Sequence, residues 1–206
     1  MISNGAYYFD DSVQKFLNKF QNFLHFDITL DGPKEVHDMC RKYHNGLGNF
    51  DDAYAAFKDC QKRFNTNTTK VTISPENLIV LDDILDFFVE EHITNIFANP
   101  IYEHNWSYDE AKIYYQKLKK IADSLLSNNT DQKYLLSIFE ENTLGYPLKE
   151  TQLETWCGGS GKMLAFDPMG NAFPCLRYMD SSLNTSQKPL IIGDCINGIY
   201  NTLDSQ

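Results

Sequence analysis

The sequence predicts an α/β protein in which parallel strands alternate with helices and a small β-rich unit follows them. Two observations support this prediction. Over the first two-thirds of the 206 residues, short runs rich in β-branched and aromatic residues alternate with longer amphipathic stretches, which is typical of βα units. From Trp156 onward, glycines, prolines and short β runs dominate instead. We therefore predict one domain over residues 1–145 and a second over residues 150–206.

The first βα unit begins on a short strand. We predict this strand over Ile2–Tyr8, and the polar residues from Asp10 to Ser12 then begin a helix. Its buried face is predicted by an apolar stripe at helical spacing, which comprises Val13, Phe16, Leu17, Phe20 and Phe23. A four-unit sheet that begins on such a stub resembles the later part of a longer βα array.

Three more units follow, each a strand and then an amphipathic helix. The predicted strands are His25–Leu30, Thr68–Ser74 and Ile93–Ala98. The predicted helices are Phe50–Phe64, a stretch from Leu78 to Phe88, and a long helix whose core-facing seam runs from Tyr108 to Leu125. Between the second strand and its helix, the chain breaks at Asp31-Gly32-Pro33 and crosses a polar loop.

The end of the chain has a different pattern. A short helix is predicted over Gln132–Glu141. Leu164–Phe166 and Ala172–Phe173 then flank Asp167-Pro168-Met169-Gly170-Asn171, which predicts a β-hairpin turn with Gly or Asn in the left-handed position. Ile191–Gly193 suggests one more strand.

Charge and hydropathy exclude some classes of protein. The chain has 18 basic and 28 acidic residues, so its net charge is −10, and its Lys and Arg residues are scattered among carboxylates. Because phosphate contact needs clustered basic residues, we expect no nucleic-acid binding. No apolar run is long enough to cross a bilayer, and the first residues lack the pattern of a signal peptide. We therefore expect no membrane association and a cytoplasmic location.

Polar residues at the ends of the predicted strands form the first candidate site. Thr29 and Asp31 end the second strand, and Ser74 and Asn77 follow the third. Since α/β proteins bind small molecules at the carboxyl ends of parallel strands, these groups suit a ribose, an amine and a carboxylate. The alternative is that they only cap helices and form turns. Arg41 can bind a carboxylate or phosphate, or it can pair at the surface with Asp38 or Glu35.

The five cysteines are an odd number at wide spacing without a secretion signal, which fits reduced thiols or metal ligation better than a disulfide framework. They are Cys40, Cys60, Cys157, Cys175 and Cys195. His37-x2-Cys40-x3-His44 is similar to a fragment of a zinc site, but a structural zinc needs about four ligands and no second pair stands nearby. Cys157 and Cys175 bracket the predicted hairpin, which brings its two ends together, so both thiolates could face one metal centre. The alternative is two ordinary buried cysteines.

Two stretches resemble a known family. Phe26-Asp27-Ile28-Thr29-Leu30-Asp31-Gly32-Pro33-Lys34-Glu35-Val36-His37-Asp38-x-x-Arg41, with Asn45-Gly46-x-Gly48-x-Phe50-Asp51, resembles the middle of radical S-adenosylmethionine (radical SAM) enzymes of the anaerobic sulfatase-maturase and peptide-maturase group. The segment from Cys157 to Cys175 resembles the opening Cys-x(9–15)-Gly-x(4)-Cys of their SPASM domain. Among these enzymes, the maturases of cysteine-repeat peptides are the most similar.

This resemblance implies a fold and a set of cofactors. The fold would be a partial (β/α) barrel with parallel strands, followed by a small β-rich unit of the SPASM or twitch type. Cys157 and Cys175 would be ligands of an auxiliary [4Fe–4S] cluster. Thr29, Asp31, Arg41, Ser74 and Asn77 would line the pocket for S-adenosylmethionine or substrate. The intact family modifies a peptide or protein through a 5′-deoxyadenosyl radical, and its cofactor supplies that chemistry.

The sequence also departs from the family pattern. It has no Cys-x3-Cys-x2-Cys, no Gly-Gly-Glu-type stretch, and none of the later SPASM cysteines; Cys195 stands where the family has no ligand. We therefore interpret the chain as part of such an enzyme, truncated at both ends, and expect that it does not start the radical reaction alone. A barrel left incomplete exposes a strand edge, which favours oligomerisation.

A second hypothesis comes from another functional class. The chain could be a non-catalytic α/β module that binds a peptide, in which Cys157 and Cys175 are structural. The missing cysteines favour this interpretation, as do the aromatic residues Tyr102, Trp106 and Trp156, which could stack on a ligand.

Overall fold

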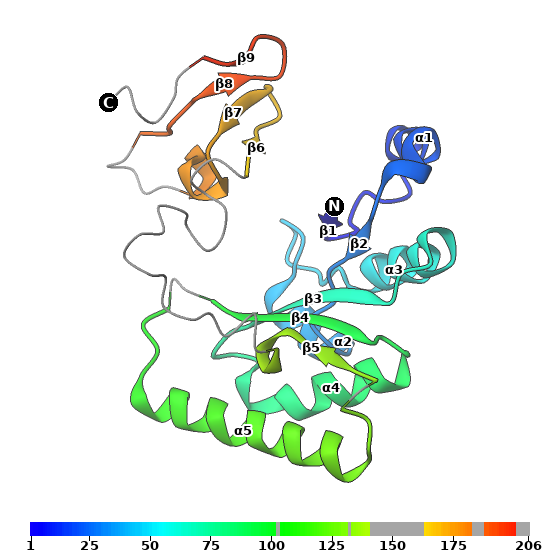
Figure 1. Ribbon diagram of the computed structural model, residues 1–206, viewed down its shortest axis with the longest axis vertical. Helices are drawn as coiled ribbons and strands as arrows, with labels where there is room; N and C mark the ends of the chain where they lie inside the picture. Colours follow the sequence, from blue (N-terminus) through cyan, green and yellow to red (C-terminus); the bar gives the residue numbers. More distant parts are fainter. Residues whose placement is uncertain (102–103, 132, 141–162, 183–187, 201–206) are drawn as a thin grey trace. The chain divides into compact units, whose positions relative to one another are not determined.

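The structure, a computed structural model, describes residues 1–101, 104–131, 133–140, 163–182 and 188–200. The chain divides into two compact units, Met1–Leu144 and Gly145–Gln206. The first unit contains parallel strands with helices, and the second contains an antiparallel sheet (Figure 1). This architecture confirms the predicted α/β fold in which a β-rich unit follows parallel strands.

The described strands of the first unit all pair in parallel. Strand β1 (Ile2–Ser3) pairs with β2 (Asp27–Ile28), and β4 (Asn95–Pro100) pairs with both β3 (Thr68–Ile73) and β5 (Leu135–Leu136). A buried threonine links the two sheets, because the Thr69 hydroxyl donates to Ile28 O at 3.0 Å and accepts the Leu30 N–H at 2.9 Å. The two parallel sheets thus lie side by side, joined through Thr69, as part of a (β/α) barrel.

The described part of the first unit contains five α-helices, which connect the strands. They are α1 (Asp11–Phe20), α2 (Lys34–Cys40), α3 (Phe50–Phe64), α4 (Leu81–Glu90) and α5 (Tyr108–Ser127). Short 3-10 helices cover Gln21–Phe23, Leu78–Val80 and Ser137–Phe139. Among the described residues, no helix has the length and apolar character needed to cross a membrane.

The core of the first unit lies between the sheet and its helices. Strand β3 alternates side chains, so Thr69, Val71 and Ile73 are buried while the residues between them are not. Figure 1 shows α4 and α5 on one face of the β3–β4–β5 sheet, and Ile84 of α4 and Ile121 of α5 lie with Val71 around one small internal cavity. These branched side chains fit the closely packed interior that such a layer requires.

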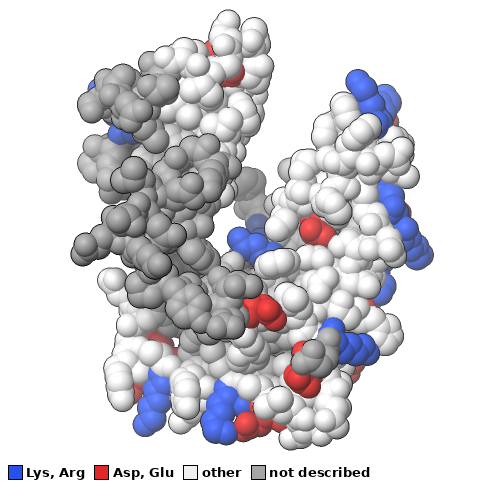
Figure 2. All heavy atoms as spheres, viewed as in Figure 1, with Lys and Arg blue, Asp and Glu red and all other residues white. Residues whose placement is uncertain are grey.

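Ion pairs join the two outer helices of this layer. Asp82 of α4 accepts hydrogen bonds from Lys117 at 3.0 Å and Lys120 at 2.6 Å, both on α5. These bonds lower the pKa of the Asp82 carboxyl against the opposing effect of burial. On the face of the first unit seen in Figure 2, basic and acidic side chains are interspersed, as these pairings require.

Helix α3 has the predicted bounds, and helix α2 was missed. The apolar pattern places Phe50–Phe64 correctly, with Ala53, Phe57 and other residues of one face fully buried. Lys34–Cys40, predicted as a break and a polar loop, forms α2 instead. Pro33 has a φ of −62° and stands just before the first helical residue, so it begins the helix rather than ending the structure.

Two other predicted elements were wrong. Residues 132–141 were predicted as a short helix, but Leu135–Leu136 form strand β5, which pairs with Asn95 and Ile96 of β4. Two or three apolar residues beside a sheet edge do not reveal their period, so the sequence could not distinguish the two structures. The first strand ends at Ser3 instead of Tyr8, because a turn follows in which Tyr8 N donates to Gly5 O at 3.0 Å.

The predicted apolar stripe of α1 is only partly buried. Leu17 is fully buried, but Phe16 is 41% exposed and Phe23 is 86% exposed. Among the described residues, the sheet ends at β1, and Phe16 lines a shallow groove with Met1, Ile2 and other residues. The helical period was therefore right, while the width of the buried face was overestimated.

The described part of the second unit is a four-stranded antiparallel sheet. Its strands, in order, are β6 (Ala165–Phe166), β7 (Asn171–Phe173), β8 (Gly193–Asp194) and β9 (Gly198–Ile199). The predicted hairpin is confirmed: the Asp167 carboxylate accepts the N–H groups of Met169 and Asn171, each at 2.9 Å, and Gly170 has a φ of +86°. Short 3-10 helices cover Leu176–Tyr178 and Asp180–Ser182.

Gly32, which follows the end of β2, offers a test of this packing. Its φ is +131°, and a Cβ atom there would lie 2.9 Å from Ile84 Cγ1. Gly32→Ala should therefore lower the free energy of unfolding by about 2–4 kcal/mol, through backbone strain and overpacking. Gly46→Ala is the matched control, because Gly46 has a φ of +84° but open space around it, and should cost about 1 kcal/mol. Urea denaturation measures both; equal losses would contradict the packing argument.

Candidate functional site

A cavity of about 470 Å³ opens at the carboxyl ends of β2 and β3. Its lining comprises Asp31, Met39, Cys40, Arg41, Thr72, Ser74, Glu76 and Ile101. The volume lies within the roughly 300–1,000 Å³ usual for small-molecule sites. Three predicted site residues, Asp31, Arg41 and Ser74, therefore come together here, although they are far apart in the sequence. Sequence reasoning missed Cys40, Thr72 and Glu76 as lining residues.

Asp31 is the buried anchor of this cavity. Its side chain is 3% exposed and forms an ion pair with Arg41, whose side chain is 27% exposed. The same carboxylate accepts the N–H of Thr72 at 2.9 Å, which fixes the end of β2 against β3. The sequence suggested Asp38 or Glu35 as the partner of Arg41. Asp38 instead accepts the N–H of Phe50 at the start of α3.

Arg41 is held at both its backbone and its side chain. Its N–H donates to His37 O at 3.0 Å, and its carbonyl accepts the Asn49 N–H at 3.3 Å. The guanidinium donates through Nε and Nη2 to Asp31. Since a guanidinium has five N–H donors in a planar fork, three remain after these two bonds. Arg41 is thus a pre-oriented cation that can bind a carboxylate or phosphate at the cavity.

His37 lies directly beneath this pair and is fully buried. Its Nδ1 accepts the Asp31 N–H at 3.2 Å, and its Nε2 lies 3.0 Å from Asn49 Oδ1. Burial lowers the pKa of His37 below its usual range. Both ring nitrogens of His37 have hydrogen-bond partners within the protein, which argues against His37 as a zinc ligand. The described residues also contain no group of three or more His, Cys, Asp or Glu that could hold a metal ion.

Ser74 and Asn77 form the turn after β3. Asn77 is 1% exposed; its side-chain oxygen accepts the Ser74 N–H at 2.9 Å, and its side-chain nitrogen donates to Thr72 O at 2.9 Å. Asn77 therefore shapes the turn from below, while Ser74 lines the cavity. The Ser74 hydroxyl lies 3.6 Å from Cys40 Sγ, and it also bonds Glu76, which lowers the pKa of that carboxyl.

Thr29 is buried behind the lining of the cavity. Its N–H donates to Ser3 O at 2.8 Å, and it joins the ends of β1 and β2. The structure does not place it among the residues that line the cavity at Asp31. Of the five predicted pocket residues, Thr29 and Asn77 thus support the walls, whereas Asp31, Arg41 and Ser74 face the open space.

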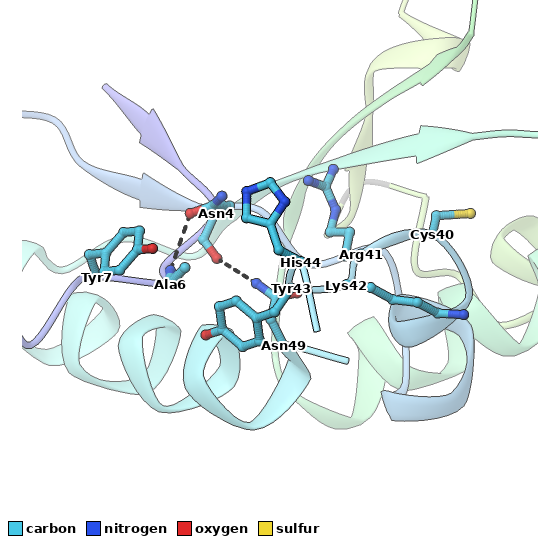
Figure 3. A pocket seen from close by; sticks show the side chains of 9 residues that line it. All are labelled: Asn4, Ala6, Tyr7, Cys40, Arg41, Lys42, Tyr43, His44 and Asn49. Carbon is cyan, nitrogen blue, oxygen red and sulfur yellow. Dashed lines mark hydrogen bonds between the residues drawn. The ribbon is translucent and has the colours of Figure 1, made fainter. Parts of the chain in front are cut away.

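A second cavity, of about 320 Å³, shares Cys40 and Arg41 with the first (Figure 3). It is otherwise lined by Asn4, Ala6, Tyr7, Lys42, Tyr43, His44 and Asn49. Figure 3 shows Asn4 bridging the loop, since its Oδ1 accepts Ala6 N–H at 3.1 Å and its carbonyl accepts Asn49 Nδ2 at 3.4 Å. The Tyr43 hydroxyl donates to Asp52 at 2.6 Å, which raises the pKa of Tyr43 to about 12. Cys40 and Arg41 thus line both cavities.

The predicted cluster ligands lie in the second unit. Cys175 is buried, and its Sγ accepts the Arg177 N–H at 3.4 Å, while Cys157 lies outside the described residues. Cys195 is exposed and packs against Gly170 in the hairpin turn. In the first unit, burial raises the pKa of the Cys60 thiol to about 11, which makes that cysteine a core residue.

The aromatic residues of the peptide-binding hypothesis are described in part. The Trp106 indole N–H donates to Ile101 O at 2.8 Å, and its ring stacks on Tyr114 of α5 with the ring centroids 6.4 Å apart. Trp106 therefore packs within the first unit. Tyr102 and Trp156 lie outside the described residues.

Neither protein-family models nor curated proteins match this sequence. Solved structures do. The native anaerobic sulfatase-maturating enzyme anSMEcpe with bound AdoMet aligns with a TM-score of 0.63 and 18% identity, over 94% of this chain and 52% of that chain. The same enzyme with AdoMet and the Kp18Cys peptide aligns with a TM-score of 0.62 and 18% identity, over 94% of this chain and 53% of that chain. Its hexahistidine-tagged form with AdoMet aligns with a TM-score of 0.61 and 19% identity, over 94% of this chain and 52% of that chain.

These matches establish the fold. The chain shares the fold of the matched part of this enzyme, a mixed α/β arrangement of parallel strands with a separate antiparallel sheet, and it spans about half the length of the solved structures that it matches. The matched region covers nearly the whole chain, so the partial barrel and the β-rich unit are both part of the likeness.

Proposed function

We propose that this chain forms part of an S-adenosylmethionine (AdoMet)-dependent radical enzyme that modifies a peptide or protein. One observation carries the proposal: in a fold shared with an AdoMet-bound enzyme, the carboxyl ends of β2 and β3 surround a ligand-sized cavity that presents a buried, pre-oriented Asp31–Arg41 pair. The matching structures of that enzyme contain bound AdoMet, and one of them also contains the Kp18Cys peptide. The location of the cavity in an α/β sheet supports the assignment.

The residues of the cavity fit AdoMet chemically. AdoMet carries a carboxylate, an ammonium, ribose hydroxyls and an apolar ring system. The free N–H groups of Arg41 suit the carboxylate, and Ser74 and Glu76 offer oxygen acceptors for an ammonium or a hydroxyl. Met39 and Ile101 supply apolar wall. Thr29 and Asn77 hold the backbone that carries these groups.

In this proposal, the protein contributes position and electrostatics. Bound AdoMet would supply the radical chemistry, as cofactors do in enzymes of this kind. Asp31 orients Arg41 through two hydrogen bonds, so the guanidinium needs little reorganisation when a carboxylate arrives. The second cavity shares Cys40 and Arg41 with the first, and we assign it to the peptide or protein substrate.

We also propose Cys157 and Cys175 as ligands of an auxiliary [4Fe–4S] cluster. The proposal rests on their spacing around the hairpin, which the structure describes from Met163 onward. Cys175 stands at the end of that hairpin, and its sulfur accepts the Arg177 N–H at 3.4 Å. Two thiolates are half of the usual set of four protein ligands.

Arg41→Met should weaken AdoMet binding by about tenfold or more, because it removes a charge-assisted contact to the carboxylate. Equilibrium dialysis of the full chain against labelled AdoMet measures the change. Arg41→Lys keeps the charge but loses the fork and should give an intermediate affinity. The matched control is Lys34→Met, since Lys34 pairs with Asp51 away from the cavity. Equal affinity of Arg41→Met and the wild-type chain would contradict the assignment.

A further inference from the structure

The histidine beneath the cavity joins three parts of the fold. Through Nδ1, His37 accepts the N–H of Asp31 after β2, and through Nε2 it contacts the side chain of Asn49 at the start of α3. Asn49 in turn donates to the carbonyl of Asn4, which follows β1. A single buried ring therefore connects the ends of β1 and β2 with the beginning of α3.

The hydrogen bonds determine which tautomer the ring adopts. A backbone N–H can only donate, so Nδ1 of His37 must be an unprotonated acceptor for Asp31. The proton of the neutral ring then resides on Nε2, which donates to Asn49 Oδ1 at 3.0 Å. The amide nitrogen of Asn49 donates to Asn4 O, which is consistent with this direction. Protonation of Nδ1 would set two N–H donors against each other and break the contact with Asp31.

The contact with Asp31 matters because that residue holds Arg41. The backbone of Asp31 is fixed by the ring, and its carboxylate then reaches both Arg41 and the Thr72 N–H. The backbone of Arg41 is also tied to His37, whose carbonyl accepts its N–H at 3.0 Å. His37 thus contacts both members of the ion pair and faces neither cavity as a lining residue.

We propose that His37 is a positioning residue: its neutral Nε2–H tautomer holds Asp31, and through it Arg41, in the geometry that binds AdoMet, so that protonation of the ring releases the pair. This inference rests on the function proposed above. It adds a residue that does not touch the ligand, together with a dependence of binding on pH.

The surroundings of the ring keep it neutral. Burial is the largest effect and lowers the pKa of His37. The carboxylates of Asp31 and Asp38 oppose this shift, and the guanidinium of Arg41 adds to it; α3 presents Asn49 and the edge of the Phe50 ring. Because the folded-state pKa lies below the ordinary value of about 6.5, the ring is neutral at neutral pH and gains its proton only in acid.

Two substitutions separate the two ring contacts. In His37→Asn, the amide oxygen stands near the place of Nδ1 and can still accept the Asp31 N–H. In His37→Gln, the amide nitrogen stands near the place of Nε2 and can donate to Asn49, while the Asp31 N–H loses its acceptor. We expect His37→Gln to weaken AdoMet binding by about tenfold and His37→Asn by no more than about threefold. A purely structural role would make affinity follow stability alone in both variants.

The pH dependence gives a second readout. Wild-type affinity should fall severalfold as the pH is lowered from about 7.5 to about 5, and the His37→Asn variant should not show this fall. His25→Asn is the control, since His25 is exposed and lies outside both cavities. The free energy of unfolding should also decrease as the pH is lowered. The unfolded chain binds a proton at His37 before the folded chain does, so the free energy of unfolding falls as the pH drops below about 6.5.

The closing experiment is an NMR titration of the ¹⁵N-labelled full chain without AdoMet, followed by the same titration with it. The inference predicts an Nε2–H tautomer for His37 at neutral pH, and amide shifts of Asp31 and Thr72 that titrate together with that ring. Amide shifts of Asp31 and Thr72 that do not change when the His37 ring titrates, or an Nδ1–H tautomer, would overturn the inference even if AdoMet binds. Amides that follow the ring in a chain that binds no AdoMet at any pH would overturn the proposed function instead.

Discussion

Asp31→Ala should lower the free energy of unfolding by about 3 kcal/mol and weaken AdoMet binding by about tenfold or more. The substitution leaves the partly buried Arg41 without its partner and the Thr72 N–H without its acceptor. Breaking a buried ion pair by removing one member costs about 3–5 kcal/mol. The Thr72 N–H is only partly buried, so its lost acceptor adds little to this cost. We use the lower end because the Arg41 side chain is 27% exposed and water can solvate it. Urea denaturation and equilibrium dialysis measure the two effects.

Two variants isolate the cause of this loss. Asp31→Asn keeps an oxygen acceptor for Thr72 and should recover part of the stability, but not the orientation of Arg41 or the affinity for AdoMet. Asp51→Ala removes the carboxylate of an exposed pair with Lys34 and should change stability far less. If Asp31→Ala were no more destabilising than Asp51→Ala, the buried pair would not be the anchor of the cavity.

Replacing Cys157 and Cys175 together by alanine should remove most of the iron that the chain retains after anaerobic reconstitution with iron and sulfide. Iron–sulfur clusters are held by cysteine thiolates, and the double variant keeps neither of the two proposed ligands. Bound iron per chain and the visible absorption of the cluster are the measurements. Circular dichroism checks that the variant is folded, because Cys175 is buried.

The control is a double variant with the same number of thiols removed. Cys40 and Cys195 are both exposed, and neither is a proposed cluster ligand, so Cys40→Ala with Cys195→Ala should retain as much iron as the wild-type chain. Equal iron in both double variants would show nonspecific binding to thiols and would contradict the ligand assignment. A wild-type chain that retains no iron would contradict it as well.

Sequence periodicity predicted the parts of the fold that depend on a broad apolar face. Helix α3 was located correctly because Ala53, Ala56, Phe57 and Cys60 repeat at helical spacing and all become fully buried. The hairpin at Asp167–Asn171 was predicted because its turn uses local side-chain chemistry that does not depend on distant residues.

Short elements were missed where tertiary contacts decide the structure. Strand β5 has two residues, and its parallel pairing with β4 is what makes it a strand. Helix α2 has seven residues, and its sequence after Asp31-Gly32-Pro33 has the appearance of a turn. Propensity is a weak guide at such lengths, since packing of a few side chains outweighs it.

The candidate site was predicted in part. The rule that ligands bind at the carboxyl ends of parallel strands led to Asp31 and Ser74, which do line the cavity. The rule could not show that Arg41 pairs with Asp31 rather than Asp38, because α2 returns the chain toward β2. His37 was considered only as a metal ligand. Its burial, and hence its role beneath Asp31, follows from packing that no local pattern encodes.

A site-resolved AdoMet titration of the ¹⁵N-labelled wild-type chain, followed by ¹H–¹⁵N NMR at neutral pH, shows whether the cavity at the ends of β2 and β3 binds AdoMet. It detects binding even at a dissociation constant of about 1 mM, an affinity near −4 kcal/mol. We expect saturable shifts centred on the amides of Asp31, Arg41 and Ser74, with a dissociation constant about tenfold or more higher in Arg41→Met and unchanged in Lys34→Met. An absence of saturable shifts, or shifts centred on residues away from the cavity at the ends of β2 and β3, would contradict the proposed AdoMet site.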